Sequence, residues 1–262
     1  MIDLSTKNIG VIIQARMGST RLPGKVLKTV SPNSNITLLE YMVNRVNKSK
    51  LIDRVVVATS TNKIDDPVSD LVKGRLFNTK VFRGSENDVL SRFYECAMDN
   101  NFDIIARLTA DCPFIDPDVI DKCIISHVES GADYTSNTCP PSESLYPDGS
   151  DIEVFGFNTL ATTNSYAATK ESREHVTFFM WKNSKMFKTK LIKDLDEDLS
   201  SFRYTIDYPE DLEVFRLIYT ELERKGIFGH TADIVSELKD NKSIRDLNSF
   251  HFAGEGWEKY NE

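Results

Sequence analysis

The stretch GVIIQARMGSTRLPGKVLK, residues 10–28, contains the first element of the fold and the loop that follows it. Its apolar run predicts a buried strand over 9–13. The following loop carries Arg16, Arg21, Lys25 and Lys28 and no acidic residue, although the whole chain has a formal net charge of -8. A cationic loop directly after a buried strand is suited to an anionic ligand.

The first half of the chain alternates short β-branched runs with amphipathic runs of helix length. Strands that are apolar on both faces and separated by helices predict a mostly parallel, twisted sheet flanked by helices, an α/β fold. Thr37 and Glu40 form a capping box, which predicts the start of the first helix. We expect strands over 9–13, 54–59, 80–83 and 103–108, and further helices over 87–98 and 118–128.

The pattern loosens after residue 133. The polar, proline-bearing stretch 136–151 is too long for a plain connector and predicts a lid or a binding loop. A strand, helices and a second strand are expected over 152–192, so that about 136–192 forms a small inserted lobe. A returning strand over 202–206 and a helix over 209–224 follow. We therefore expect one domain, 1–262, with an insert.

Composition excludes several classes of protein. The hydrophobic share of 40% and the charged share of 27% are typical of a globular chain with a core. No apolar run reaches the roughly 18 residues of a membrane span, and no secretory signal opens the chain, so we expect a cytoplasmic protein. The acidic balance argues against nucleic-acid binding. The four cysteines match no metal or disulfide spacing and are expected to be buried thiols.

The opening loop is not a Walker A motif. Gly18 and Gly24 are separated by five residues instead of four, and Lys25 is followed by valine. The guanidinium groups of Arg16 and Arg21 and the ammonium of Lys25 nevertheless suit a polyphosphate. Small residues in the loop let backbone N–H groups approach such a ligand.

Ligands of open parallel sheets lie beyond the carboxyl ends of the strands, which directs attention to the loops after 13, 83, 108 and 206. Asp111 stands in one of them, either as a turn residue before proline or as a Mg²⁺ ligand. Asp207 can cap the helix that follows it. Ser85 and Asp88 form a second potential capping box, and the helix end there can face a nucleotide.

Five polar residues of the second half of the chain can be interpreted in two ways. Each can be an ordinary surface residue, but together they supply an arginine for a carboxylate and acids for hydroxyl groups, as a sugar-acid pocket needs. They are Asp148, Asp151, Glu153, Arg173 and His175. Nothing in the sequence indicates a nucleophilic side chain.

The stretch IIQARMGSTRLPGKVL resembles the N-terminal signature of the spore-coat polysaccharide biosynthesis protein F family, although relatives usually have proline in place of Gln14. This family belongs to the sugar-acid cytidylyltransferases, whose relatives make CMP-activated Kdo and sialic acids. Further similar stretches are VFRGSENDVLSRF (81–93), ARLTADCPFIDP (106–117), YPDGSDIEVF (146–155), SREHVT (172–177) and RYTIDYPEDLE (203–213).

The resemblance implies a Rossmann-like, GT-A-like nucleotidyltransferase fold and transfer of CMP from CTP, or from another NTP, to a small sugar-acid acceptor. Pyrophosphate is released, and the product serves polysaccharide biosynthesis. It also implies Mg²⁺ on Asp111 and Asp207, and a homodimer formed through the inserted lobe. The general base stays open between Asp151, Asp207 and water.

The implied site residues fall into three groups. The catalytic residues are Arg16, Lys25, Asp111 and Asp207. The nucleotide-binding residues are Ala15, Arg16, Gly18, Ser19, Thr20, Arg21, Lys25, Arg83, Ser85 and Asp88. The acceptor-binding residues are Asp148, Asp151, Glu153, Arg173 and His175.

An alternative activity is that of a GT-A glycosyltransferase, which transfers the sugar of a finished nucleotide sugar. Such enzymes commonly carry an Asp-x-Asp motif at the metal. Here Asp111 stands alone, with Asp116 five residues further on, which disfavours this alternative.

Overall fold

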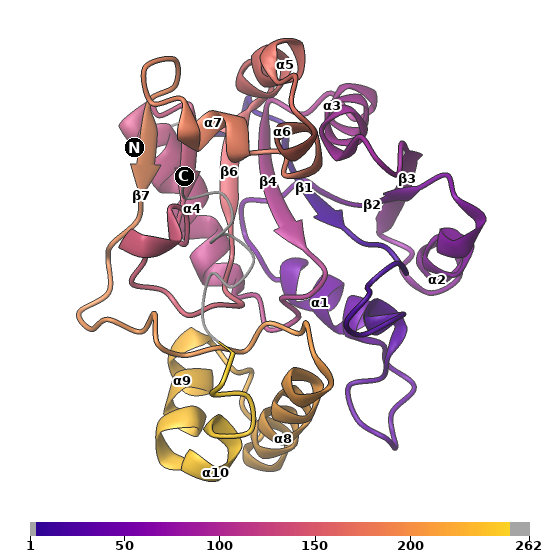
Figure 1. Ribbon diagram of the computed structural model, residues 1–262, viewed down its shortest axis with the longest axis vertical. Coiled ribbons are helices and arrows are strands. Elements are labelled where there is room, and N and C mark those ends of the chain that lie inside the picture. Colours follow the sequence, from indigo (N-terminus) through magenta and orange to yellow (C-terminus); the bar gives the residue numbers. More distant parts are fainter. Residues whose placement is uncertain (1–3, 252–262) are drawn as a thin grey trace.

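A computed structural model of the protein describes residues 4–251. Its centre is one sheet of seven strands in the order β3-β2-β1-β4-β6-β5-β7 (Figure 1). Neighbouring strands are parallel except where β6 pairs with β4 and β5. The mostly parallel sheet is therefore confirmed. The strands are β1 (Ile9–Gln14), β2 (Arg54–Ser60), β3 (Thr79–Gly84), β4 (Ile104–Thr109), β5 (Tyr134–Ser136), β6 (Glu153–Gly156) and β7 (Thr189–Leu191).

Ten α-helices and three short 3-10 helices accompany these strands in the described part of the chain. The α-helices are α1 (Leu38–Val46), α2 (Asp66–Arg75), α3 (Val89–Asp99), α4 (Pro117–Ser130), α5 (Phe157–Tyr166), α6 (Lys170–Glu174), α7 (Phe178–Lys182), α8 (Pro209–Lys225), α9 (Thr231–Asp240) and α10 (Lys242–Arg245). The 3-10 helices are η1 (Lys25–Leu27), η2 (Lys63–Asp65) and η3 (Pro141–Glu143).

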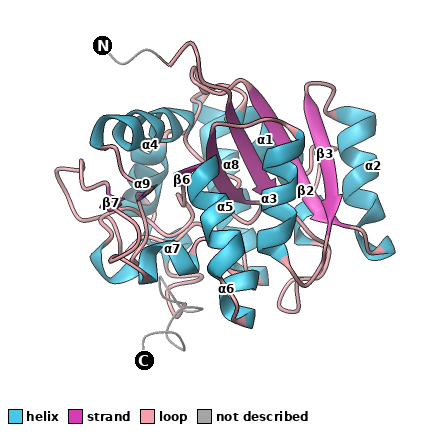
Figure 2. Cartoon of the chain, turned by 90° about the horizontal axis from the view of Figure 1, so that it is seen from above, coloured by secondary structure: helices cyan, strands magenta, loops and turns pink. Residues whose placement is uncertain are grey.

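Helices cover both faces of the sheet because β1, β2 and β4 are apolar on both faces. Val11 and Ile13 of β1 belong to a core cluster with side chains of α1, α2 and α4. Ile12 belongs to a second cluster with α3, α5 and α7. Figure 1 shows α3, α5 and α6 on one side of the sheet and α1 on the other, and Figure 2 shows the same layers from above. The four strands predicted in the first half are confirmed to within one residue at each end.

The helix starts are partly as predicted. Thr37 and Glu40 form the expected reciprocal capping box. Ser85, however, does not begin the next helix: its Oγ accepts the N–H of Asp88, and Asp88 is the N-cap of α3. The helix begins three residues later than that capping box implied, because the carboxylate of Asp88 accepts the N–H of Ser91.

The expected returning strand over 202–206 is wrong. This segment is extended but forms only one isolated bridge, between Asp148 and Arg203. Its buried side chains, Tyr204 and Ile206, instead pack in a third core cluster with α8 and α9. The alternation of apolar and polar residues in this segment therefore does not reflect sheet pairing, because the whole of 202–206 is buried. Figure 1 shows α8, α9 and α10 together, beyond α1.

The segment 136–192 adds strands to the same sheet. β6 pairs antiparallel with β4, and β7 pairs parallel with β5. Its apolar residues pack mainly on the face of the sheet that α3 also covers: Phe155 and Met180 are buried there, and Phe179 and Trp181 are partly buried against them. The main sheet is thus a partner surface for this aromatic group.

The strand order creates a switch point between β1 and β4. From β1 the chain proceeds to β2 and β3 on one side, and then returns to β4 on the other side of β1. The loops that follow β1 and β4 therefore diverge, and they leave a crevice at the carboxyl edge of the sheet.

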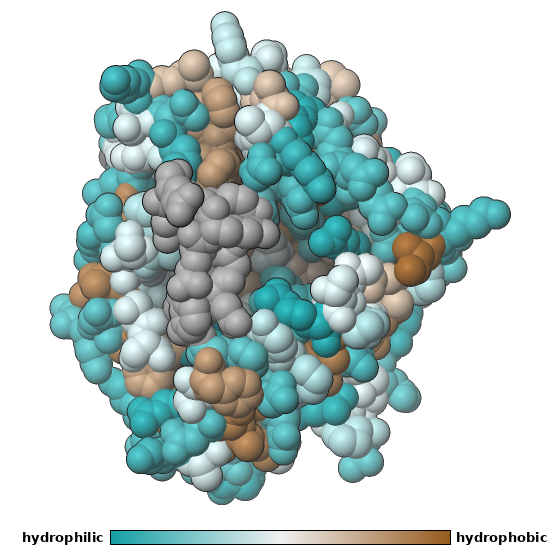
Figure 3. Space-filling view, viewed as in Figure 1, coloured by the Kyte–Doolittle hydropathy of each residue, from teal (hydrophilic) through white to brown (hydrophobic). Residues whose placement is uncertain are grey.

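The surface and the cysteines agree with the sequence expectations. All four cysteines are buried free thiols. The face in Figure 3 is largely hydrophilic, and its hydrophobic residues lie in separate small groups. No helix within residues 4–251 is long and apolar enough to cross a membrane.

Candidate active site

A cavity of about 400 Å³ lies at the switch point. The loop after β1 forms one wall, and the end of β4 with its following loop forms the floor. The other side is closed by residues of the segment 138–153 and by His175, Thr205 and Asp207. The predicted site residues on its lining are Arg16, Gly18, Ser19, Thr20, Arg21, Lys25, Asp111, Asp148, Asp151, Glu153, His175 and Asp207.

The ammonium of Lys25 lies between two carboxylates of the cavity lining, those of Asp111 and Asp207. Its Nζ lies 3.0 Å from Asp111 Oδ2 and 2.9 Å from Asp207 Oδ1, and it donates a third hydrogen bond of 2.8 Å to the carbonyl oxygen of Ile206. Lys25 is only 9% exposed. The structure thus brings together residues that are 86 and 182 positions apart in the chain.

These charges stabilise one another. Burial alone would raise the pKa of Asp111, but the charge of Lys25 together with hydrogen bonds from Thr109 and Lys25 outweighs burial and lowers that pKa to about 2. Burial alone would lower the pKa of Lys25, but Asp111 and Asp207 raise it. Lys25 and Asp111 are therefore both charged at neutral pH.

The local backbone explains how Lys25 reaches this place. Gly24 has φ of 66° and precedes η1, a left-handed conformation that glycine adopts without strain. The next residue after the lysine, Val26, is buried in the core and anchors the turn. The backbone N–H of Met17 donates to Asp65, which fixes the start of the loop.

The arginines of the loop differ in their surroundings. Arg21 forms an ion pair of 3.0 Å with Asp207 and lies over the ring of Tyr208. Arg16 is exposed and forms no ion pair within residues 4–251. No sequence pattern indicated that acids far along the chain neutralise two of the loop cations, Arg21 and Lys25. Ala15, by contrast, is buried and does not line the cavity.

Asp207 is not the cap of α8. Tyr208 holds the N-cap position, and the backbone N–H groups of Asp207 and Tyr208 both donate to Asp211. Arg203 binds Asp211 and also reaches Asp207 at 3.7 Å. Sequence reasoning missed Arg203 and Asp211, although the spacing of Asp211 three residues after Tyr208 was a capping signal.

Two carboxylates on the opposite side of the cavity are held close together. Asp148 pairs with Arg203. Burial, and secondly the charge of Asp151, raise the pKa of Asp148 to about 8. Asp151 accepts hydrogen bonds from Thr138 and from the backbone of Gly149, and it forms no ion pair in the described part of the chain. Burial also raises the pKa of Asp151.

Glycine is required between these two carboxylates. Gly149 has φ of +110°, and a Cβ atom there would lie 2.5 Å from the backbone nitrogen of Thr205. The close approach of the two backbones brings Asp148 and Asp151 to the cavity.

Glu153 lines the cavity with both oxygens engaged. It pairs with Arg107 and accepts hydrogen bonds from the hydroxyls of Tyr134 and Thr177. Arg107 also reaches the side chain of Gln14 at 3.4 Å.

Besides Ala15, four predicted residues do not line this cavity: Arg83, Ser85, Asp88 and Arg173. Arg173 makes a bidentate ion pair with Asp88, with distances of 2.9 and 2.6 Å, and donates to Asn164. Arg83 pairs with Asp66. Ser85 is exposed at the start of the turn before α3. The structure thus joins Arg173, expected at the acceptor, to Asp88, expected at the nucleotide, and the pair links α6 to α3.

The two carboxylates beside Lys25 fit a divalent cation. One oxygen of Asp111 and one of Asp207 converge on a single positive group, and carboxylate oxygens are the ligands that Mg²⁺ prefers. A group of three potential ligands, Asp116, Asp118 and His230, lies elsewhere. There the carboxylate of Asp116 accepts the N–H groups of Asp118 and Thr231, so it caps α4 and α9.

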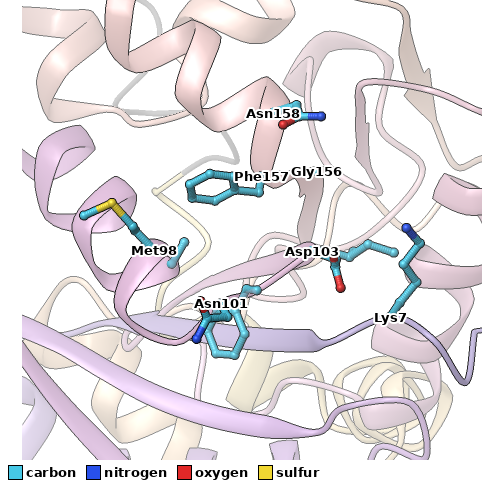
Figure 4. A pocket seen from close by; sticks show the side chains of 10 residues that line it. Lys7, Met98, Asn101, Asp103, Gly156, Phe157 and Asn158 are labelled. Carbon is cyan, nitrogen blue, oxygen red and sulfur yellow. The ribbon is translucent and has the colours of Figure 1, made fainter.

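A second cavity of about 410 Å³ lies at the opposite, amino-terminal edge of the sheet (Figure 4). Figure 4 shows Met98 and Phe157 on one side of it and Asp103 and Lys7 on the other. It holds one carboxylate and one ammonium, whereas the first cavity gathers four cationic and five acidic side chains. The side chains that could bind a charged ligand are therefore concentrated at the first cavity.

Comparison with known proteins identifies the family of the chain. The family model of the cytidylyltransferases matches residues 10–247. A solved structure of a cytidylyltransferase from Leptospira borgpetersenii is similar at 33% identity with a TM-score of 0.82, and the match covers 91% of this chain and 97% of that one.

Two curated proteins are also similar. The spore coat polysaccharide biosynthesis protein SpsF of Bacillus subtilis is 36% identical over 214 residues, 79% of this chain and 85% of that protein. A 3-deoxy-manno-octulosonate cytidylyltransferase of Geobacter sulfurreducens is 30% identical over 125 residues, 48% of this chain and 47% of that protein.

Proposed function

The chain belongs to the cytidylyltransferase family, and from this premise we propose that it transfers CMP from CTP to a hydroxyl group of a sugar acid and releases pyrophosphate. The cavity at the switch point carries the proposal. It faces the cationic loop on one side and the carboxylates Asp148 and Asp151 on the other, so a polyphosphate and a polyhydroxylated acceptor can lie side by side.

The names of the relatives support the finer assignments. SpsF is a polysaccharide biosynthesis protein, and the Geobacter relative acts on a sugar acid. We therefore propose that the product enters surface polysaccharide biosynthesis in the cytoplasm. The family membership favours nucleotidyl transfer over the glycosyltransferase alternative.

The reaction needs little covalent work from the protein. The acceptor hydroxyl attacks the α-phosphorus in line, the bond to the bridging oxygen breaks, and pyrophosphate leaves. The loop cations lower the barrier by stabilising the charge on the phosphate oxygens. Arg16 is the residue best placed to bind the nucleotide first, because it lines the cavity and has no ion pair within residues 4–251.

We propose Asp111 and Asp207 as the residues that hold a magnesium ion. When bound, the ion supplies positive charge to the phosphate oxygens. Both carboxylates stand at the cavity floor, and Arg21 and Arg203 hold Asp207 in place.

The acceptor proton needs a base, and we propose Asp151 for it. Asp207 is engaged by Lys25 and Arg21, whereas Asp151 lines the cavity with no ion pair among the described residues. Burial raises the pKa of Asp151, which brings it toward the range of an effective general base.

A coupled assay tests the function. The protein is incubated with Mg²⁺, each of the four NTPs and a panel of sugar acids and neutral sugars, while pyrophosphate release is followed and products are identified by mass spectrometry. We expect release only with CTP and a sugar acid, and about a hundredfold or greater loss in Asp151→Asn. Transfer to neutral sugars alone would refute a sugar acid as the acceptor. Full activity of Asp151→Asn would refute Asp151 as the general base.

A further inference from the structure

The ammonium of Lys25 has no N–H left for a phosphate. An ammonium group has three donors, and here they go to Asp111, Asp207 and the carbonyl of Ile206. The side chain is also nearly enclosed, at 11% exposure. In this state Lys25 acts on the two carboxylates and not on a ligand.

The position of this ammonium is also the place where the two carboxylates converge. Their oxygens lie 3.0 and 2.9 Å from Nζ. A divalent ion such as Mg²⁺ binds carboxylate oxygens at about 2.0–2.1 Å, so Asp111 and Asp207 would close by about 1 Å each around it. An ammonium and a metal ion cannot occupy this position together.

We propose that Lys25 is a resident counter-ion that keeps Asp111 and Asp207 paired and competes with divalent cations for them, so that a metal ion binds them tightly only when it is in large excess or when a nucleotide has drawn the ammonium away. The inference rests on the proposed use of Asp111 and Asp207 as metal-holding residues. It makes Lys25 a positioning residue in the ligand-free protein, with a second role at the phosphates after it has moved.

Charge explains why such a counter-ion is needed. Without Lys25, two carboxylates would face each other across a partly buried floor, which is unfavourable for both. Arg21 and Arg203 contact Asp207 but form no ion pair with Asp111 among residues 4–251. The long, flexible stem of a lysine allows the ammonium to leave while the backbone of η1 stays in place.

Metal titration without nucleotide tests the inference directly. The affinity for Mn²⁺ is measured by calorimetry, and free Mn²⁺ by electron paramagnetic resonance, in the wild type, Lys25→Met and Lys28→Met. Methionine keeps the unbranched stem, shorter by one atom, and removes the charge. Lys28 is the matched control, because it is half-buried in the same loop and its side chain contacts neither carboxylate.

We expect Lys25→Met to bind Mn²⁺ about tenfold or more tightly than the wild type, because two unpaired carboxylates become available. Lys28→Met should match the wild type, and Lys25→Met with Asp111→Asn should lose the gain. Equal affinity of the wild type and Lys25→Met would overturn the inference. Because the titration needs no turnover, tight Mn²⁺ binding by Lys25→Met together with no CMP transfer by the wild type would uphold the counter-ion and refute the proposed function.

A measurement on the wild type covers the case in which Lys25→Met does not fold. Reductive methylation of Lys25 is followed by peptide mass spectrometry with and without excess MgCl₂, relative to Lys28. Displacement by the metal ion should increase the labelling of Lys25 severalfold and leave Lys28 unchanged. Unchanged labelling of Lys25 would contradict the exchange.

Discussion

Arg16 and Lys25 stand nine residues apart in one loop, but the fold gives them opposite environments. Lys25 is buried among three acceptors, and Arg16 is exposed beside the cavity with no ion pair in the described chain. We therefore expect loss of the Lys25 charge to affect folding and function together, and loss of the Arg16 charge to affect function alone.

We expect Arg16→Ala to lose activity and to keep its stability. Removing a close contact to phosphate charge costs about 3 kcal/mol in the transition state, or about a hundredfold in kcat/KM. Pyrophosphate release and thermal unfolding measure the two effects. Lys25→Ala, by contrast, should also lower the melting temperature. A turnover of Arg16→Ala equal to that of the wild type would remove this residue from the mechanism.

The carboxylates at the floor give a second prediction. Asp111→Asn should abolish Mg²⁺-dependent transfer, and Asp207→Asn should weaken it severely, because asparagine keeps the shape but not the charge that a divalent ion needs. The rate is measured over a Mg²⁺ titration. Asp70→Asn, an exposed acid on α2, is the control. Retained activity and metal dependence in both site variants would show that the metal is held elsewhere.

At the scale of elements, the sequence predicts β1 to β4 well because each strand is an apolar run long enough to be buried on both faces. The helix α2 was not predicted. Its apolar residues Val68, Leu71 and Val72 are few, and Pro67 and Gly74 are turn signals. The strand β5 was not predicted, because its three residues are too few for a recognisable period, whereas β7, of the same length, lies where the second strand of 152–192 was expected.

The candidate site was likewise predicted only in part from the sequence. The sequence places the cationic loop and Asp111 at strand ends, and these do meet. The pairing of Arg173 with Asp88 depends on the packing of α6 beside α3, two elements 85 residues apart in this contact. No local pattern encodes that contact. The pairing of Arg203 with Asp148 and Asp211 is of the same kind.

One helix–strand contact predicts a pH dependence of stability. His127 of α4 is buried, its Nδ1 lies 3.1 Å from the hydroxyl of Thr135 in β5, and burial lowers its pKa to about 4. The unfolded chain binds a proton near pH 6.5, which the native histidine does not. Stability should therefore fall as the pH is lowered from about 6.5 to 4, by up to about 3 kcal/mol from this residue.

Chemical denaturation at several pH values measures this effect. His127→Gln removes the titrating group, so the decrease between pH 6.5 and 4 should be smaller than in the wild type. Equal pH dependence of His127→Gln and the wild type would show that other groups cause the decrease.

At the scale of the whole molecule, the segment 152–192 raises the question of assembly. Most of its aromatic residues pack on their own sheet, so they do not require a second subunit. Tyr166 and Met186 nevertheless remain 64% and 48% exposed. We propose that two copies associate through this segment, with the two-fold symmetry that is commonest among homo-oligomers.

Sedimentation at micromolar protein concentration tests the assembly. We expect a species of about twice 29.8 kDa, and we expect Tyr166→Lys with Met186→Lys to shift it toward the monomer, because buried charges oppose association. Ile64→Lys is the control, since Ile64 is 55% exposed but lies in η2, outside the segment. A fully active monomer would refute the dimer and leave the proposed nucleotide site unaffected.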